Sequence, residues 1–130
     1  HRSLEDLSII DVRVFNYFSH TQDMNARFLI TDIVRALKNK EVFKTSSDNI
    51  VRDFVTPPGF YALIQAIIDF KPINTALDCY TKSPVSKFDL LSELESKFGL
   101  NYEINESIDI INATGSKINY YSNLRMIIFI

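Results

Sequence analysis

The stretch from Ile9 to His20, IIDVRVFNYFSH, constrains the fold more than any other part of the chain. Its β-branched and aromatic residues favour a strand, and Ile10, Val12 and Val14 alternate with their neighbours as strand residues do. Because both faces are largely apolar, the pattern predicts a strand covered on both sides, which is typical of a parallel α/β sheet. Ligands of such sheets bind beyond the carboxyl ends of the strands, so Asn16 to His20 is a candidate contact segment.

The composition of the 130-residue chain limits the class of protein. Hydrophobic residues make up 46% of it and the net charge is −2, which suits a single globular domain over residues 1–130. The 14 basic residues are spread along the chain, which argues against nucleic-acid binding. No apolar run approaches the length of a membrane span. The single cysteine, Cys79, excludes an internal disulfide and is compatible with a cytoplasmic location.

The two ends of the sequence add an expectation about its extent. The chain begins at His1 without a methionine and ends in the apolar run Met126–Ile130, which a natural terminus rarely leaves in water. We therefore expect a fragment of a longer protein. A strand edge and an apolar end that have lost their cover favour self-association, so we also expect a homo-oligomer.

Predicted strands and helices alternate along the rest of the chain. Apolar residues at helical spacing predict a helix from about Ala26 to Lys40, capped by Asp23 or Asn25. Short strands are expected at Glu41–Lys44, Ile50–Val55, Thr75–Cys79 and Tyr102–Ile104, and helices at Thr56–Phe70, at Ser86–Gly99 and after Ser122, with a loop-rich Asn105–Lys117. This order gives the α/β class, or a mixed α+β remnant if most of a parallel sheet lies outside the chain.

The segment Arg13-Val14-Phe15-Asn16-Tyr17-Phe18 resembles the sixth-strand segment, R-x-F-N-x-Y-G-P, of the extended short-chain dehydrogenase/reductases. These are the Rossmann-type, NAD-dependent sugar-nucleotide epimerases and dehydratases. The asparagine of that family faces the nucleotide-sugar, so the resemblance implies that Asn16 binds substrate. Ser19-His20 replaces the usual Gly-Pro, and the loop is therefore expected to differ. Taken alone, Asn16 fits better as a strand-end residue that bonds to nearby backbone.

A second segment, Val51 to Val55, is similar to the R-D-F/W-x-x-V segment of the same family. The resemblance implies that Arg52 binds the nucleotide diphosphate, a role that suits a guanidinium because it offers a planar fork of donors and keeps its charge. The alternative from the residues is a surface ion pair of Arg52 with Asp48 or Asp53. Pro57-Pro58-Gly59 replaces the acidic residue usual at the next helix, so that entry is expected to differ.

A third segment, Arg27 to Lys38, resembles the substrate-side helix of some dehydratases of nucleotide-activated hexoses. Arg27 lies near the predicted helix start, where main-chain N–H groups and the helix dipole favour a phosphate. A solvated first-turn arginine is the equal alternative. Asn74–Tyr80 and Pro84–Leu91 look like the family's following strand and helix, so the resemblance extends over nearly the whole chain.

Two catalytic features of that family are missing from the sequence. Gly59, Gly99 and Gly115 are far apart, whereas a dinucleotide-binding loop needs three clustered glycines. No lysine follows a tyrosine by four residues, so the Tyr-x-x-x-Lys pair is absent. The scattered histidines, cysteine and carboxylates do not form a metal-ligand set. We therefore expect no catalytic residue, no cofactor and no metal in this chain, whereas the resemblance implies NAD(P) in the parent enzyme.

Together these patterns predict the carboxyl-terminal, nucleotide-sugar-binding portion of an NAD(P)-dependent sugar-nucleotide epimerase or dehydratase, inactive alone. Asn16, Arg27 and Arg52 are its expected substrate-binding residues. A stand-alone, non-catalytic protein-interaction domain is the alternative from a different class, and in it the same three residues would be structural. The expected partners are a nucleotide-sugar and further copies of the chain, without nucleic acid or membrane.

Overall fold

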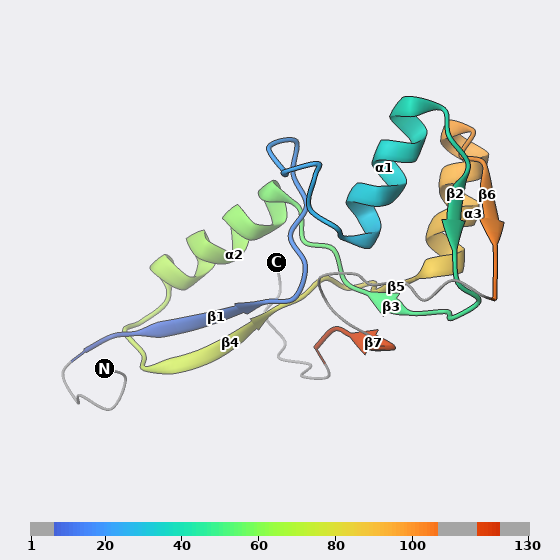
Figure 1. Cartoon of the computed structure of the whole chain (residues 1–130). Helices are drawn as coiled ribbons and strands as arrows, with labels where there is room; N and C mark the ends of the chain where they lie inside the picture. The colour runs from blue at the N-terminus through green and yellow to red at the C-terminus, as the bar shows by residue number, and fades with distance from the viewer. Residues whose placement is uncertain (1–6, 107–116, 123–130) are drawn as a thin grey trace. The chain divides into compact units, whose positions relative to one another are not determined.

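The computed structural model describes residues 7–106 and 117–122 (Figure 1). These residues fall into two units. Unit 1 contains residues 7–19, 53–84 and 121–122, and unit 2 contains residues 20–52, 85–106 and 117–120. The helix predicted after Ser122 and most of the predicted loop from Asn105 to Lys117 lie outside the described residues.

The sheet of unit 1 is the parallel pair of β1 (Ile10–Val14) and β4 (Thr75–Cys79). The bounds of β4 are those predicted, whereas β1 is shorter than the strand-like stretch from Ile9 to His20. Val12 is in register with Leu77, and Val14 with Cys79. Since side chains alternate along a strand, these residues share one face of the sheet.

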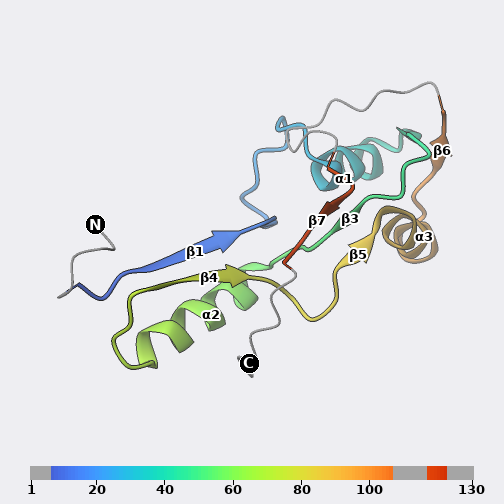
Figure 2. The same cartoon turned by 90° about the horizontal axis from the view of Figure 1, so that it is seen from below.

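Helix α2 (Pro57–Asp69) covers that face, as Figures 1 and 2 show. Its start is the predicted one, because Thr56 is the N-cap and its side chain accepts a hydrogen bond from the Gly59 N–H. The core of unit 1 consists of Val55, Leu63 and Cys79, with Val12, Phe60 and Ile67 packed against it. Cys79 is thus the small buried residue that a strand cysteine usually is.

Strand β1 is more exposed than the sequence pattern predicted. Asp11, Arg13 and Val14 are exposed, and β4 is the strand that pairs with β1 among the described residues. The prediction of a strand covered on both faces is therefore not met in this part of the chain. The reason is that α2 covers the Val12 face, while Arg13 on the other face forms an ion pair with Asp78 (Nε to Oδ1, 2.6 Å).

The core of unit 2 is enclosed by α1 (Leu29–Asn39), α3 (Lys87–Phe98) and the parallel pair of β2 (Phe43–Thr45) with β6 (Tyr102–Ile104). Its buried residues are Ile33, Ala36, Phe43, Leu91 and Leu100. Three of them are no more than 1% exposed, namely Ile33, Leu91 and Leu100. Burying such a side chain contributes about 1.5–3 kcal/mol, so this cluster holds unit 2 together.

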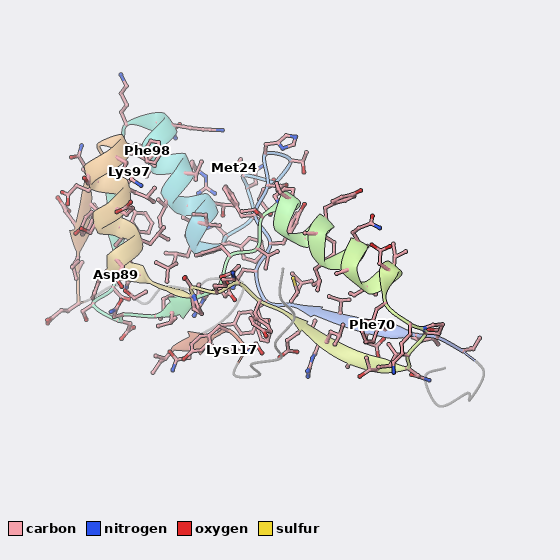
Figure 3. All side chains as sticks on the ribbon, turned by 180° about the vertical axis from the view of Figure 1, so that it is seen from behind. Met24, Phe70, Asp89, Lys97, Phe98 and Lys117 are labelled. Carbon is pink, nitrogen blue, oxygen red and sulfur yellow. The ribbon has the colours of Figure 1, made fainter. Side chains whose placement is uncertain are left out.

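The helix ends of unit 2 agree with the sequence at α3 and differ from it at α1. Ser86 caps α3 by accepting from the Asp89 N–H, and Gly99 ends the helix with a left-handed φ of 70°. Figure 3 labels Asp89 in the first turn of α3 and Phe98 in the last. The N-cap of α1 is Phe28 and not Asp23 or Asn25.

The correction at α1 has a local cause. The Asp23 side chain already accepts from the Asn25 N–H (2.9 Å), which closes a turn before the helix. The Thr31 hydroxyl accepts from the Phe28 N–H (3.1 Å) and donates to the Ala26 carbonyl (2.6 Å). The fully buried Thr31 therefore makes the side-chain hydrogen bonds at this helix start that a polar cap residue was expected to make.

A three-stranded sheet completes unit 2, with the order β5-β3-β7 (Figure 2). Strand β3 (Val51–Arg52) is central, pairing antiparallel with β5 (Val85–Ser86) and parallel with β7 (Asn119–Tyr120). The sheet thus places Arg52, a predicted site residue, at the end of its central strand. Among the described helices of both units, none has the length and hydrophobicity to cross a membrane.

Candidate functional site

Arg52 is buried at the end of β3 and is 3% exposed. Its guanidinium donates three hydrogen bonds to carbonyls: Nη2 to Lys117 (2.9 Å), and Nη1 to Val51 (2.8 Å) and Ile118 (3.3 Å). An arginine has five N–H donors, so two make no hydrogen bond to the residues that the structure describes. The side chain therefore ties the start of β7 to β3 and keeps part of its donor fork.

The groups that accept hydrogen bonds from the charged Arg52 guanidinium are uncharged carbonyls. No ion pair joins it to a carboxylate within the described residues, and its guanidinium carbon lies 5.9 Å from the centre of the Tyr120 ring. The Lys117 Nζ lies 4.7 Å from the same ring, and Figure 3 labels Lys117 beside β7. Burial lowers the pKa of the Arg52 guanidinium, while nearby Tyr120 opposes the shift. An anion would stabilise this cation.

The surface ion pair considered for Arg52 does not form. Asp53 is buried instead, at 1% exposure, and accepts from the Thr81 N–H (2.8 Å) and the Thr81 hydroxyl (2.5 Å). Successive residues of an extended chain point in opposite directions, so the two neighbouring charges have separate partners. Asp53 is therefore a buried hydrogen-bond acceptor and not the surface partner of Arg52.

Asn16 follows β1 by two residues and is bonded through its main chain. Its carbonyl accepts from the Val55 N–H (2.9 Å), and Tyr17 forms a parallel bridge with Val55. The side-chain nitrogen Nδ2 is buried and has no hydrogen-bond partner among the residues that the structure describes. A buried amide nitrogen without an acceptor costs about 1–3 kcal/mol, so an acceptor brought by a ligand would be favourable here.

Arg27 lies just before the N-cap of α1, and its side chain is 69% exposed. Its Nε is 3.4 Å from the carboxylate of Asp32, which also pairs with Arg35 (Nη1 to Oδ1, 2.9 Å). An exposed pair of this length contributes at most about 1 kcal/mol. Arg27 and Arg52 belong to unit 2 and Asn16 to unit 1.

A pocket of about 480 Å³ lies beside β4 in unit 1. Its wall is formed by Thr56, Gly59 and Leu63 near the start of α2, and by residues 75–82 along and after β4. None of the three predicted site residues lines it. Sequence patterns did not reveal this pocket, because its lining is mostly apolar and comes from segments that are separated in the chain.

A second buried cation lies in unit 2. Lys87, at 1% exposure, is the first residue of α3, and its Nζ donates to the Ser46 carbonyl (2.6 Å). Burial lowers the pKa of the Lys87 amine, and the nearby Asp48 carboxylate opposes the shift. This burial was not predicted from sequence, because a lysine after a helix cap is usually solvated. The described residues hold no group of three or more histidine, cysteine, aspartate or glutamate side chains that could bind a metal ion.

Comparison by sequence finds no relative, since no protein-family model and no curated protein matches the chain. Comparison by structure does find similar folds. MoeE5 in complex with UDP-glucuronic acid and NAD matches with a TM-score of 0.68 and 20% identity over 91% of this chain. The UDP-glucuronic acid 4-epimerase from Bacillus cereus, in complex with UDP-glucuronic acid and NAD, matches with a TM-score of 0.70 and 16% identity over 90%.

A third similar structure is DesIV, the dTDP-glucose 4,6-dehydratase from Streptomyces venezuelae, with NAD and TYD bound. It matches with a TM-score of 0.67 and 14% identity over 88% of this chain. The chain spans only 38%, 37% and 35% of the three matched proteins, in the order given. The resemblance predicted from sequence is therefore confirmed as one of fold, and the chain has the mixed α/β fold of part of the Rossmann-type, NAD-dependent sugar-nucleotide epimerases and dehydratases.

Proposed function

We propose that this chain is the nucleotide-sugar-binding, carboxyl-terminal portion of an NAD(P)-dependent sugar-nucleotide epimerase or dehydratase and is inactive alone. The observation that carries the proposal is a shared fold over about nine tenths of the chain with enzymes of this kind. The chain spans under two fifths of each, and its sequence lacks the clustered glycines and the Tyr-x-x-x-Lys pair. NAD(P) and the hydride-transfer step belong in this proposal to the parent enzyme.

Arg52 and Asn16 are the proposed substrate contacts with the best physical support. Arg52 is a buried cation without a carboxylate partner among the described residues, and it keeps two N–H donors. The unpartnered Nδ2 of Asn16 supplies a donor for a sugar or phosphate oxygen. Arg27 is the weaker second cation, because it is exposed and shares Asp32 with Arg35. The proposed compartment is the cytoplasm, where a free thiol such as Cys79 remains reduced.

One observation favours the second candidate, a non-catalytic interaction domain. The three bonds of Arg52 to main-chain carbonyls and its 3% exposure are also what a purely structural arginine would show. The two candidates differ in what Arg52 substitutions do to ligand binding when the fold is kept.

Calorimetric titration of the chain with UDP-glucuronic acid, UDP-glucose and dTDP-glucose tests the proposal. We expect saturable binding of at least one of them, weakened about tenfold to a hundredfold by Arg52→Ala, because each charge-assisted bond contributes about 1.5–3 kcal/mol. Arg52→Lys should recover part of the loss, since an ammonium ion cannot reproduce the donor fork. Lys44→Ala, at an exposed position of β2, is the control and should leave the affinity unchanged.

Circular dichroism of each variant separates lost binding from lost folding. NADH fluorescence should show no saturable micromolar binding, because the dinucleotide loop is absent. If no nucleotide-sugar binds at millimolar concentration, or if a folded Arg52→Ala variant binds as the parent does, the interaction domain is the better description.

A further inference from the structure

Lys117 and Arg52 lie against the same aromatic ring in unit 2. The Lys117 Nζ is 4.7 Å from the centre of the Tyr120 ring, and the Arg52 guanidinium carbon is 5.9 Å from it. The strand register explains this arrangement, because Arg52 and Tyr120 are partners in the parallel pair of β3 with β7. The Arg52 Nη2 also donates to the Lys117 carbonyl (2.9 Å), which fixes the main chain of Lys117 relative to the guanidinium. Two positive charges are therefore held near one another.

The two cations differ in how easily a ligand can reach them. Arg52 is 3% exposed and donates three hydrogen bonds to carbonyls, whereas Lys117 is exposed. An ammonium group has three N–H donors, and among the described residues the contact of the Lys117 ammonium is with the Tyr120 ring. Lys117 is thus the cation that a ligand meets first, and Arg52 holds it in place from the interior.

The contacts of these two side chains do not neutralise their charges. Within the part of the chain that the structure describes, no carboxylate forms an ion pair with either of them. The face of an aromatic ring attracts a cation but carries no net charge. Because like charges that lie close together repel each other, the binding of an anion beside Lys117 and Arg52 would be favourable.

We propose that Lys117 is a further ligand-binding residue, whose ammonium binds the diphosphate group of a nucleoside diphosphate together with Arg52. This inference rests on the proposed function for the choice of ligand. A diphosphate has several anionic oxygens, so it can accept hydrogen bonds from an ammonium and a guanidinium at once, whereas a monophosphate has fewer. Lys117 was not predicted from sequence, because 65 residues separate it from Arg52.

Calorimetric titration with UDP compares the parent with two variants of Lys117. Lys117→Met keeps an apolar side chain of similar length against Tyr120 and removes the charge, so the affinity for UDP should fall about fivefold to tenfold. Lys117→Arg keeps the charge and should bind within about twofold of the parent. Lys44→Met is the matched control, since it removes one positive charge from an exposed position of β2, and should leave the affinity unchanged.

Two further ligands distinguish a phosphate contact from a structural role. The ratio of the affinity for UDP to that for UMP should be smaller in Lys117→Met than in the parent, because the lost charge acts on the diphosphate. Inorganic pyrophosphate should compete with UDP for the parent and compete less well for Lys117→Met. A variant that had merely lost its fold would bind UDP and UMP more weakly in the same proportion, and its circular dichroism would change.

The outcomes for this inference and for the proposed function are separable. If nucleotide-sugars bind and a folded Lys117→Met variant binds UDP as tightly as the parent, the inference fails and the proposed function stands. If UDP and pyrophosphate bind in a manner that depends on Lys117 while no nucleotide-sugar binds, the inference stands and the proposed function fails. If the parent binds none of these phosphates, both are overturned.

Discussion

Unit 2 and unit 1 bury their apolar residues to different extents. In unit 2, two helices and the β2–β6 pair surround a cluster whose central residues are 0–1% exposed. In unit 1, one helix covers one face of a two-stranded sheet, and Val14, Tyr61 and Ile68 remain exposed. The difference indicates that truncating a core side chain should cost more stability in unit 2 than truncating a partly exposed side chain in unit 1.

The largest expected effect compares a core truncation in unit 2 with one at the exposed edge of unit 1. Leu91→Ala should lower the free energy of unfolding by about 3–5 kcal/mol, because Leu91 is fully buried and its removal leaves a cavity. Val14→Ala should lower it by less than about 1 kcal/mol, since Val14 is 38% exposed. Urea unfolding of each variant measures both. Equal losses of unfolding free energy in the two variants would contradict the proposed difference between the units.

The next effect concerns how unit 1 is held together by polar groups. Asp53→Ala should destabilise the protein by about 2–4 kcal/mol, because it removes the acceptors of the Thr81 N–H and hydroxyl, which are bonded at 2.8 and 2.5 Å. Thr81→Val should cost about 1–2 kcal/mol, since only the hydroxyl is lost. The double variant should cost less than the sum, which a double-mutant cycle from urea unfolding would measure. Additive losses would mean that the two residues do not interact as described.

The sequence predicted local features well because their causes are local. Thr56, Ser86 and Gly99 determine helix ends through bonds or dihedral angles within a few residues, and all three behave as predicted. Strand β4 is likewise correct to the residue. The predicted cap of α1 was wrong because the Asp23 side chain already accepts a hydrogen bond from the Asn25 N–H in the turn before the helix.

The environment of the candidate site could not be predicted in the same way. Arg52 bonds to carbonyls 65 and 66 residues away, and Asp53 to Thr81, 28 residues away. An R-D pair in a sequence does not show whether its two charges pair with each other or with distant groups. The binding of a nucleotide-sugar by Asn16 and Arg52, which the family resemblance implied, remains a prediction.

The smallest expected effect concerns the buried amine in unit 2. Lys87 is 1% exposed and donates to the Ser46 carbonyl, and its burial lowers the pKa of the amine below the usual 10.5. In the pH range between that lowered pKa and 10.5, the unfolded chain binds more protons than the folded one. Stability contributed by this group therefore rises with pH across that range, by at most about 1.4 kcal/mol per pH unit.

Comparison with Lys87→Met isolates this contribution, because methionine has a similar length and does not titrate. The parent should gain stability relative to Lys87→Met as the pH is raised from 7 to 10, in paired urea unfolding experiments at each pH. Lys97→Met provides the matched control for the substitution itself, since Lys97 lies on the same helix with its side chain 63% exposed. If the stability difference between the parent and Lys87→Met does not change with pH, the Lys87 amine is solvated in the folded protein and not buried. A falling difference would mean that Asp48 outweighs burial, since a raised pKa gives the opposite sign.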